Sequence, residues 1–223
     1  MTTISVIIPA HDAAETLGET LASVRAQSRS ADEVIVVDDG SSDDTAMVAT
    51  AGGAAVVRQA QRGVAAALNA GLQATQGDFV AFLDADDLWE PDCLRAQERH
   101  LAARADLAGS VGRFSEFPCP TLSIDVAARF VPRENEPAWL AGGMLLRRWA
   151  FDRAGFLDES IRVGAWIEWI DRARHAGCTF DPVDRVVLRR RLRPGTLSQS
   201  AVRNASLLTV ARAALARRRP PST

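Results

Sequence analysis

Apolar runs and helical spacings alternate along the first half of the chain. Four runs rich in β-branched residues predict buried strands, at Ile4 to Ala10, Glu33 to Gly40, Ala54 to Gln59 and Asp78 to Ala85. The stretches between them carry apolar residues at helical spacing and predict helices. Such alternation indicates an α/β fold with a Rossmann-like, mostly parallel sheet flanked by helices.

The second half, from residue 107, has a looser pattern. It predicts a helix at Gly164 to Gly177, a basic amphipathic helix at Ala201 to Arg219, and strands at residues 107–114, 141–148 and 184–191. Phe117 to Pro137 is rich in proline and predicts a long loop. We expect one compact domain at residues 1–198, built from halves 1–106 and 107–198, and a C-terminal helix and tail at 199–223.

Composition limits the classes of function. The net charge of −2 gives no electrostatic footprint for nucleic acid, so we expect no nucleic-acid partner. The three cysteines lack metal-site or disulfide spacing, which is typical of reduced thiols. The first residues lack the pattern of a signal peptide, and no apolar run is long enough to span a membrane. These features predict a cytoplasmic protein.

Acidic side chains follow several predicted strands. Ligands of open parallel sheets bind outside the carboxyl ends of the strands, so these clusters should converge at one edge. Carboxylates that gather there repel one another unless a cation joins them, and a divalent ion is one such partner. Capping of the next helix is the alternative, and it stays open for Asp87. The residues concerned are His11, Asp12, Asp38, Asp39, Asp84, Asp86 and Asp87.

Several segments in order resemble the family 2 glycosyltransferases, nucleotide-sugar-dependent enzymes with the GT-A fold. The segments are SVIIPAHDAAETLGETLASVRAQS, VIVVDDGSSDDT, RGVAAALNAGLQATQGDFVAFLDADD and RRWAFDRAGFLDES. The DxD motif of the family maps to Asp84, Ala85 and Asp86. The resemblance implies transfer of a sugar from a nucleoside-diphosphate sugar to an acceptor hydroxyl, with inversion of configuration.

The resemblance also implies site residues. Asp86 would bind Mn²⁺ or Mg²⁺, and Asp84 would touch the metal or the ribose. The ion would neutralise charge on the leaving diphosphate. The residues implied for nucleotide binding are Pro9, Ala10, His11, Asp38, Asp39, Arg62, Asn69, Asp84 and Ala85.

The catalytic base is less clear from the sequence. The usual acidic pair of the family falls on Gly164-Ala165 or Ala165-Trp166, neither of which is acidic. The nearest acid on the same helical face is Glu168, followed by Asp171. Either could accept the acceptor proton. The alternative is an ordinary ion pair with neighbouring arginines, in a catalytically impaired member that binds nucleotide-sugar or glycan as a partner or regulator.

The late strand departs from the family as well. Arg193 and Thr196 stand where many members carry His and Asn, whereas Arg190 and Arg191 persist. Arginines there could clamp a diphosphate. Trp139, Trp166 and Trp169 are candidates for stacking on a sugar or for the core. The acceptor implied is a glycan, a lipid-linked sugar or a small molecule. The C-terminal helix could contact the inner face of the membrane, or its charges could simply be solvated.

Overall fold

One sheet of nine strands organises the molecule. The computed structural model describes residues 2–119 and 132–193. Within them the strand order is β3-β2-β1-β4-β8-β6-β9-β5, and β7 pairs with β6. The predicted C-terminal helix, part of the predicted loop and Thr196 lie outside the described residues.

The first half forms the parallel part of the sheet. Its strands are β1 (Ile4–Ala10), β2 (Glu33–Asp39), β3 (Ala55–Gln59) and β4 (Phe79–Phe82), and their pairings with one another are parallel. The predicted strands are therefore present, although β4 ends three residues earlier than expected. The register pairs Ala10 with Asp38 and Ile7 with Phe82, so the carboxyl ends of these strands meet at one edge.

The second half mixes the two strand directions. β8 (Met144–Arg147) runs antiparallel between β4 and β6 (Gly109–Pro118), and β9 (Phe180–Leu192) is parallel to β6. Two short strands, β5 (Leu88–Trp89) and β7 (Glu136–Pro137), complete the sheet. The strand expected at 141–148 begins late because a 3-10 turn, η1 (Ala141–Gly143), precedes it.

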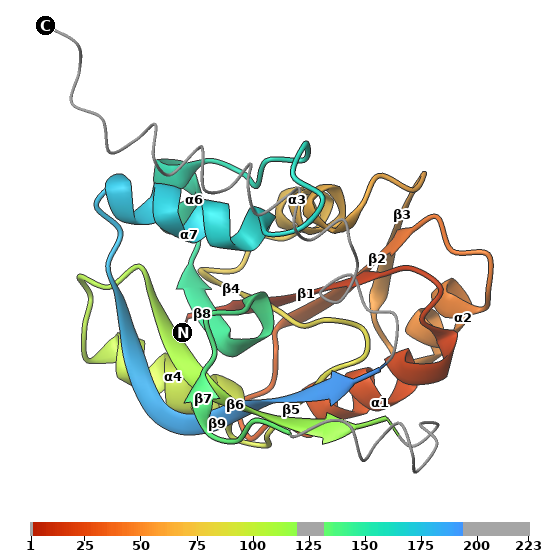
Figure 1. Ribbon diagram of the computed structural model, residues 1–223, viewed down its shortest axis with the longest axis horizontal. Coiled ribbons are helices and arrows are strands. Elements are labelled where there is room, and N and C mark those ends of the chain that lie inside the picture. Colours follow the sequence, from red (N-terminus) through yellow and green to blue (C-terminus); the bar gives the residue numbers. More distant parts are fainter. Residues whose placement is uncertain (1, 120–131, 194–223) are drawn as a thin grey trace, which may run out of the picture.

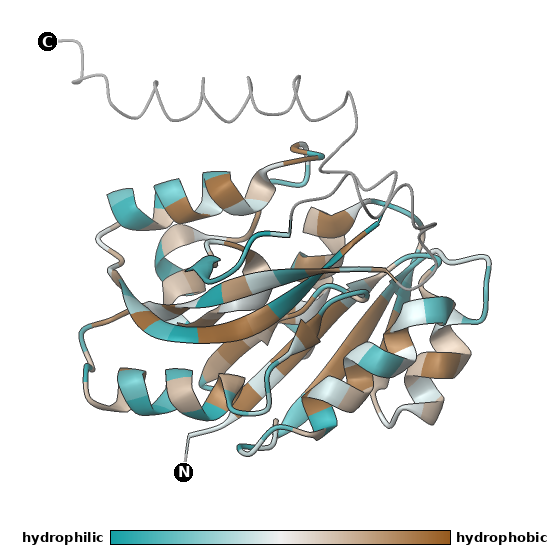
Figure 2. Cartoon of the chain, turned by 60° about the horizontal axis from the view of Figure 1, so that its bottom comes forward, coloured by the Kyte–Doolittle hydropathy of each residue, from teal (hydrophilic) through white to brown (hydrophobic). Residues whose placement is uncertain are grey.

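Helices cover both faces of the sheet (Figure 1). Helices α1 (Ala14–Arg25), α2 (Thr45–Ala51) and α4 (Cys93–Ala102) pack on one face, where they form one apolar cluster with the sheet. Helices α3 (Val64–Ala74), α6 (Trp149–Ala154) and α7 (Ala165–His175) cover the other face with a second cluster. Figure 2 shows much brown in the central strands, and helices on which teal and brown residues alternate.

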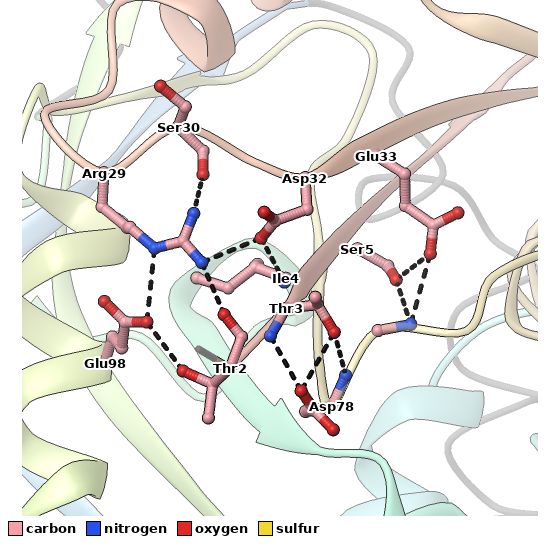
Figure 3. A network of polar contacts seen from close by, with 11 residues as sticks. Thr2, Thr3, Ile4, Ser5, Arg29, Ser30, Asp32, Glu33, Asp78 and Glu98 are labelled. Atoms are coloured by element: carbon pink, nitrogen blue, oxygen red, sulfur yellow. Dashed lines mark hydrogen bonds and ion pairs between the residues drawn. The ribbon is translucent and has the colours of Figure 1, made fainter.

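A polar network ties the amino ends of the central strands together (Figure 3). Asp78 accepts the backbone N–H of Thr3 at 2.8 Å, just before β4. Asp32 accepts the N–H of Ile4 at 2.8 Å, and Arg29 lies 2.8 Å from the same carboxylate. These contacts stabilise the amino edge of the sheet. The acidic residues that the sequence predicts to bind a ligand lie at the opposite, carboxyl edge.

Candidate active site at the carboxyl edge of the sheet

The acidic turn after β4 is held in place by helix α1. The hydroxyls of Thr16 and Thr20 donate to the carbonyl oxygen of Ala85 at 2.9 and 3.0 Å. Thr20 also donates to the carbonyl of Asp87 at 2.9 Å. Because both threonines are buried, their hydroxyls have few other partners, and the bonds fix the path of the turn. The turn therefore presents Asp84 and Asp86 from a rigid support.

The three carboxylates of this turn have different surroundings. The surface of Asp84 is partly accessible to solvent, but protein atoms surround its carboxylate closely. The resulting desolvation, together with the charge of Asp86, raises the pKa of Asp84 to about 6. Asp87 is buried, and burial with the charges of its two acidic neighbours raises its pKa well above the usual value. The backbone N–H of Arg191 donates to Asp87 at 2.8 Å and opposes that rise. Asp87 therefore belongs to the interior, and it does not cap the next helix.

Arginines at the end of β9 face the acidic turn. Arg193 places Nη2 2.8 Å from Oδ2 of Asp86. The buried side chain of Arg191 donates from Nε to the backbone carbonyl of Asp86 at 2.8 Å and from Nη2 to Glu19 at 2.6 Å. The charge of Arg190 partly opposes the rise in the pKa of Asp84. Arginine side chains of the protein thus balance part of the negative charge of this turn.

Asp38 and Asp39, at the end of β2, are buried and already hydrogen-bonded. Asp39 accepts the backbone N–H groups of Arg62 and Gly63 at 2.8 Å each, at the start of α3. Asp38 accepts the N–H of Ser41 at 2.9 Å and Nε of Arg58 at 3.1 Å. Since a carboxylate has about four acceptor positions, both can still receive a hydrogen bond from a ligand. These hydrogen bonds to neighbouring loops are therefore compatible with the predicted nucleotide role of Asp38 and Asp39.

The loop after β1 joins the same edge. Pro9 and Ala10 end β1, beside Val37 and Asp38 of β2. His11 is exposed and lies 2.8 Å from the side chain of Gln61. A half-exposed ring at a strand end suits the predicted contact with a base, and the nucleotide role of these residues stays a prediction.

Arg62 and Asn69 contact the second half of the chain. Arg62 donates to Glu159 at 2.7 Å. The buried amide of Asn69 donates to the carbonyl of Leu157 and to Glu159, both at 3.0 Å, and it accepts the N–H of Leu157 at 2.9 Å. The amide of Asn69 thus holds the loop before α7, a role that the sequence did not indicate.

Glu168 lies in the first turn of α7 and is 4% exposed. Its carboxylate pairs with Arg172 at 3.1 Å, and Arg172 also donates to the backbone carbonyls of Ala154 and Phe156. Asp171 lies 3.7 Å from His175. The structure thus shows the Glu168–Arg172 pair that the sequence offered as an alternative, although the Glu168 end of the pair is buried.

Aromatic packing places the start of α7 beside the end of β4. Trp166 meets Phe82 edge to face with ring centres 5.4 Å apart, and it stacks on Trp169 at 5.3 Å. Trp169 is fully buried, so it belongs to the core. Trp139 packs edge to face against Phe180 at 6.5 Å. The indole N–H of Trp166 is buried without a hydrogen-bond partner in the described part of the chain.

The divalent cation implied by the sequence does not fit the described residues as they are arranged. An oxygen of Asp86 is taken by Arg193, whose guanidinium cannot act as a metal ligand. In residues 2–119 and 132–193, no group of three or more His, Cys, Asp or Glu side chains could hold a metal ion. The metal role of Asp86 and Asp84 stays a prediction that the Asp86–Arg193 contact disfavours, and we derive no step through it.

A hollow of about 680 Å³ lies at the opposite edge of the sheet, lined in part by Gln76, Asp78, Arg148 and Trp149. Arg148 is committed to structural contacts there, because it donates to the carbonyl of Gly77 at 2.7 Å and to Thr75 at 3.0 Å. This hollow therefore gives no reason to move the site from the carboxyl edge.

Comparison with known sequences identifies the family. The sequence model of glycosyl transferase family 2 matches residues 5–121, slightly more than half of the chain. The chain belongs to glycosyl transferase family 2. A Nostoc protein named as the uncharacterized glycosyltransferase alr2836 is 42% identical over 98 residues, 41% of this family 2 chain and 30% of that protein.

A named relative comes from Escherichia coli. The UDP-Glc:alpha-D-GlcNAc-diphosphoundecaprenol beta-1,3-glucosyltransferase WfgD is 33% identical over 98 residues, 42% of this chain and 39% of that protein. The alignments with these two relatives therefore span less than half of either of them. Both are named as glycosyltransferases.

Solved structures confirm the fold. The S. aureus TarS fragment 1–349 in complex with UDP-GlcNAc superposes with a TM-score of 0.77 at 19% identity, over 96% of this chain and 66% of that one. The predicted GT-A fold, an α/β sheet with flanking helices in one compact domain, is thereby confirmed. No helix within the described residues is long and apolar enough to cross a membrane.

Proposed function

We propose that the chain transfers a sugar from a nucleoside-diphosphate sugar to an acceptor hydroxyl with inversion at the anomeric carbon. One observation carries the proposal: the acids after β2 and β4 and the arginines of β9 belong to a single edge of the sheet. Carboxylates can accept hydrogen bonds from base N–H groups and ribose hydroxyls, whereas arginines suit a diphosphate.

The donor is proposed to lie along this edge. Asp38 and Asp39, with Pro9, Ala10 and His11, would receive the base and the ribose. Asp84 and Ala85 would lie near the ribose and the diphosphate. UDP is the first nucleotide to test, since TarS structures contain UDP or UDP-GlcNAc.

Glu168 is our proposed base. Trp166, in the same helical turn, contacts Phe82, two residues before Asp84, and this contact supports a position of the turn near the proposed donor. The Glu168 carboxylate would take the proton of the acceptor hydroxyl. That oxygen would then attack the anomeric carbon as the bond to the diphosphate breaks, with charge-stabilising groups around the leaving oxygen. Asp171 is the second candidate.

The acceptor belongs to the second half of the proposed site. The unpaired indole N–H of Trp166 is a group that an acceptor oxygen could satisfy. The name of the E. coli relative specifies a lipid-linked acceptor, and we propose a glycan or lipid-linked acceptor here. Contact with the membrane through residues 199–223 stays a prediction about residues outside those described.

A second function is favoured by a specific observation. Positions expected to hold the acidic pair carry Gly164 and Ala165, and Glu168 is already paired with Arg172. A member that binds nucleotide-sugar without transferring it would show this arrangement.

Two measurements test the proposal. The first is a thermal-shift screen of nucleoside diphosphates, each with Mn²⁺ and with EDTA. At least one nucleotide should raise the melting temperature of the protein. Hydrolysis or transfer of the matching nucleotide-sugar then separates the enzyme from the binding-only member, which would show the shift without turnover. No shift with any nucleotide would contradict both functions.

A further inference from the structure

The geometry points to Arg193 as a built-in cation that takes the place of the divalent metal: we propose that its guanidinium, held by Asp86, binds the donor diphosphate without a metal ion. This inference rests on the proposed function, because it concerns the same donor site. It differs from the metal-assisted mechanism that the DxD motif implies.

The first argument is the position of the guanidinium. Arg193 immediately follows β9, and its Nη2 lies 2.8 Å from Oδ2 of Asp86, the residue expected to bind the metal. The side chain of Asp86 is 18% exposed. A metal ion on this oxygen would have to displace the guanidinium or lie beside it, and two cations so close together repel each other.

The second argument is the chemistry of the substitution. A neutral histidine at this position, as many family members carry, can bind a metal through a ring nitrogen. Arginine cannot, because its guanidinium stays protonated and has no acceptor atom. It does carry five N–H donors in a planar fork that matches phosphate oxygens. Compared with the histidine that the resemblance implies here, Arg193 lacks a metal ligand and offers a phosphate ligand.

The third argument is that the neighbouring contacts hold Arg193 in place and leave it accessible. Arg191, two residues earlier, fixes the end of β9 to the acidic turn through its bonds to Asp86 and Asp87. The Arg193 side chain is 36% exposed, so part of its donor fork faces solvent at the edge where the donor would lie. A guanidinium that is anchored on one side and open on the other is suited to an incoming diphosphate.

The test compares nucleotide binding with and without metal. Calorimetry of the full chain with UDP, GDP, dTDP, ADP and CDP, in EDTA and in Mn²⁺, gives two dissociation constants for each nucleotide. We expect the best nucleotide to bind in EDTA with a dissociation constant within about threefold of that in Mn²⁺. Arg193→Ala should weaken binding in EDTA at least about tenfold, and Arg193→His should make binding depend on Mn²⁺.

Arg185→Ala is the matched control, since it removes the same charge from β9, the strand that Arg193 follows. Arg185 pairs with Asp92 at 2.7 Å, immediately before α4, and not with Asp86. It should leave every constant within about twofold, and melting temperatures report whether each variant is folded.

The outcomes separate the two proposals. Binding that requires Mn²⁺ in the wild type would preserve the proposed function and overturn this inference. Equal binding by the wild type and Arg193→Ala in EDTA would also overturn it. Absence of binding by any nucleotide in either condition would overturn both.

Discussion

Arg62 and Glu159 form an ion pair at 2.7 Å that joins the two halves of the chain. The backbone N–H of Arg62 also donates to Asp39, at the end of β2. The loop before α7 is thereby connected to the proposed nucleotide edge through one residue. Because Asn69 contacts the same glutamate, the position of α7 relative to the sheet depends on both residues. Arg62 and Asn69, which were predicted to bind the nucleotide, thus also hold the loop of the second half in place.

Asn69→Ala should lower stability because it removes a buried amide that makes three hydrogen bonds. The N–H of Leu157 would lose its acceptor, and an unsatisfied buried group costs about 1–3 kcal/mol. We expect that loss in the free energy of unfolding, measured by urea denaturation. Gln73→Ala, at an exposed position on α3, is the control and should change the free energy by less than about 0.5 kcal/mol. A stable Asn69→Ala variant with lost nucleotide binding would instead support the predicted nucleotide role of Asn69.

Glu168→Gln should reduce sugar transfer by at least about 100-fold, as expected when a general base is removed. Nucleotide affinity should stay unchanged, because the proposed base contacts the acceptor. Turnover and calorimetry on the same preparation measure the two effects.

Arg172→Met separates a base from a structural partner. It breaks the same ion pair but leaves the carboxylate of Glu168, so stability should fall while turnover falls much less than in Glu168→Gln. If both variants lose turnover equally, Glu168 acts by positioning Arg172 and the loop that it contacts.

The parallel half of the fold was predictable because its signal is local. The apolar run of Ile4 to Ala10 shows a buried strand by itself, and the alternation with helices implies parallel pairing. From there, the meeting of Asp38 with the acids near Asp84 follows from topology alone. The two-residue strand Leu88–Trp89 was not predictable, since two residues show no period.

The hydrogen-bond partners of the site residues could not be predicted from local sequence patterns. Asn69 meets Leu157 at a separation of 88 residues, and Arg191 meets Asp86 at 105. Side-chain pairs over such distances leave no periodic trace in the sequence. One signal was available: the acidic run after β4 and the arginine run at the end of β9 have opposite charges. That complementarity could have suggested protein cations beside the DxD motif.

Arg191→Ala should destabilise the fold by about 2 kcal/mol, because its buried side chain holds the backbone of Asp86 and the carboxylate of Glu19. Arg189→Ala is a close control, since Arg189 stacks over the same ring of Phe117 but is 47% exposed. Its loss should cost less than about 1 kcal/mol. Chemical denaturation measures both, and equal losses would mean that stacking on Phe117, and not the link to the acidic turn, is the main contribution of Arg191.

Glu33 should make stability depend on pH. Partial burial opposes ionisation of Glu33, but hydrogen bonds from Ser5 and from the backbone of Gln76 and Gly77 outweigh it and lower its pKa. A lowered folded-state pKa gives stability that is present above the unfolded pKa, about 4.3, and is lost as the pH falls through the folded value. Glu33→Gln should therefore be less stable than the wild type at pH 7, by about 1 kcal/mol, and the difference should shrink between pH 4.5 and 3.

Urea denaturation across pH 3 to 7 measures that difference in the free energy of unfolding. Glu15→Gln, at an exposed position in the first turn of α1, serves as the control and should give a difference near zero throughout. A Glu33→Gln difference that stays constant down to pH 3 would show that the hydrogen bonds at Glu33 do not favour its ionised form. The amino edge of the sheet would then owe its stability to the neighbouring Asp32 and Asp78 contacts, which Figure 3 shows in the same network.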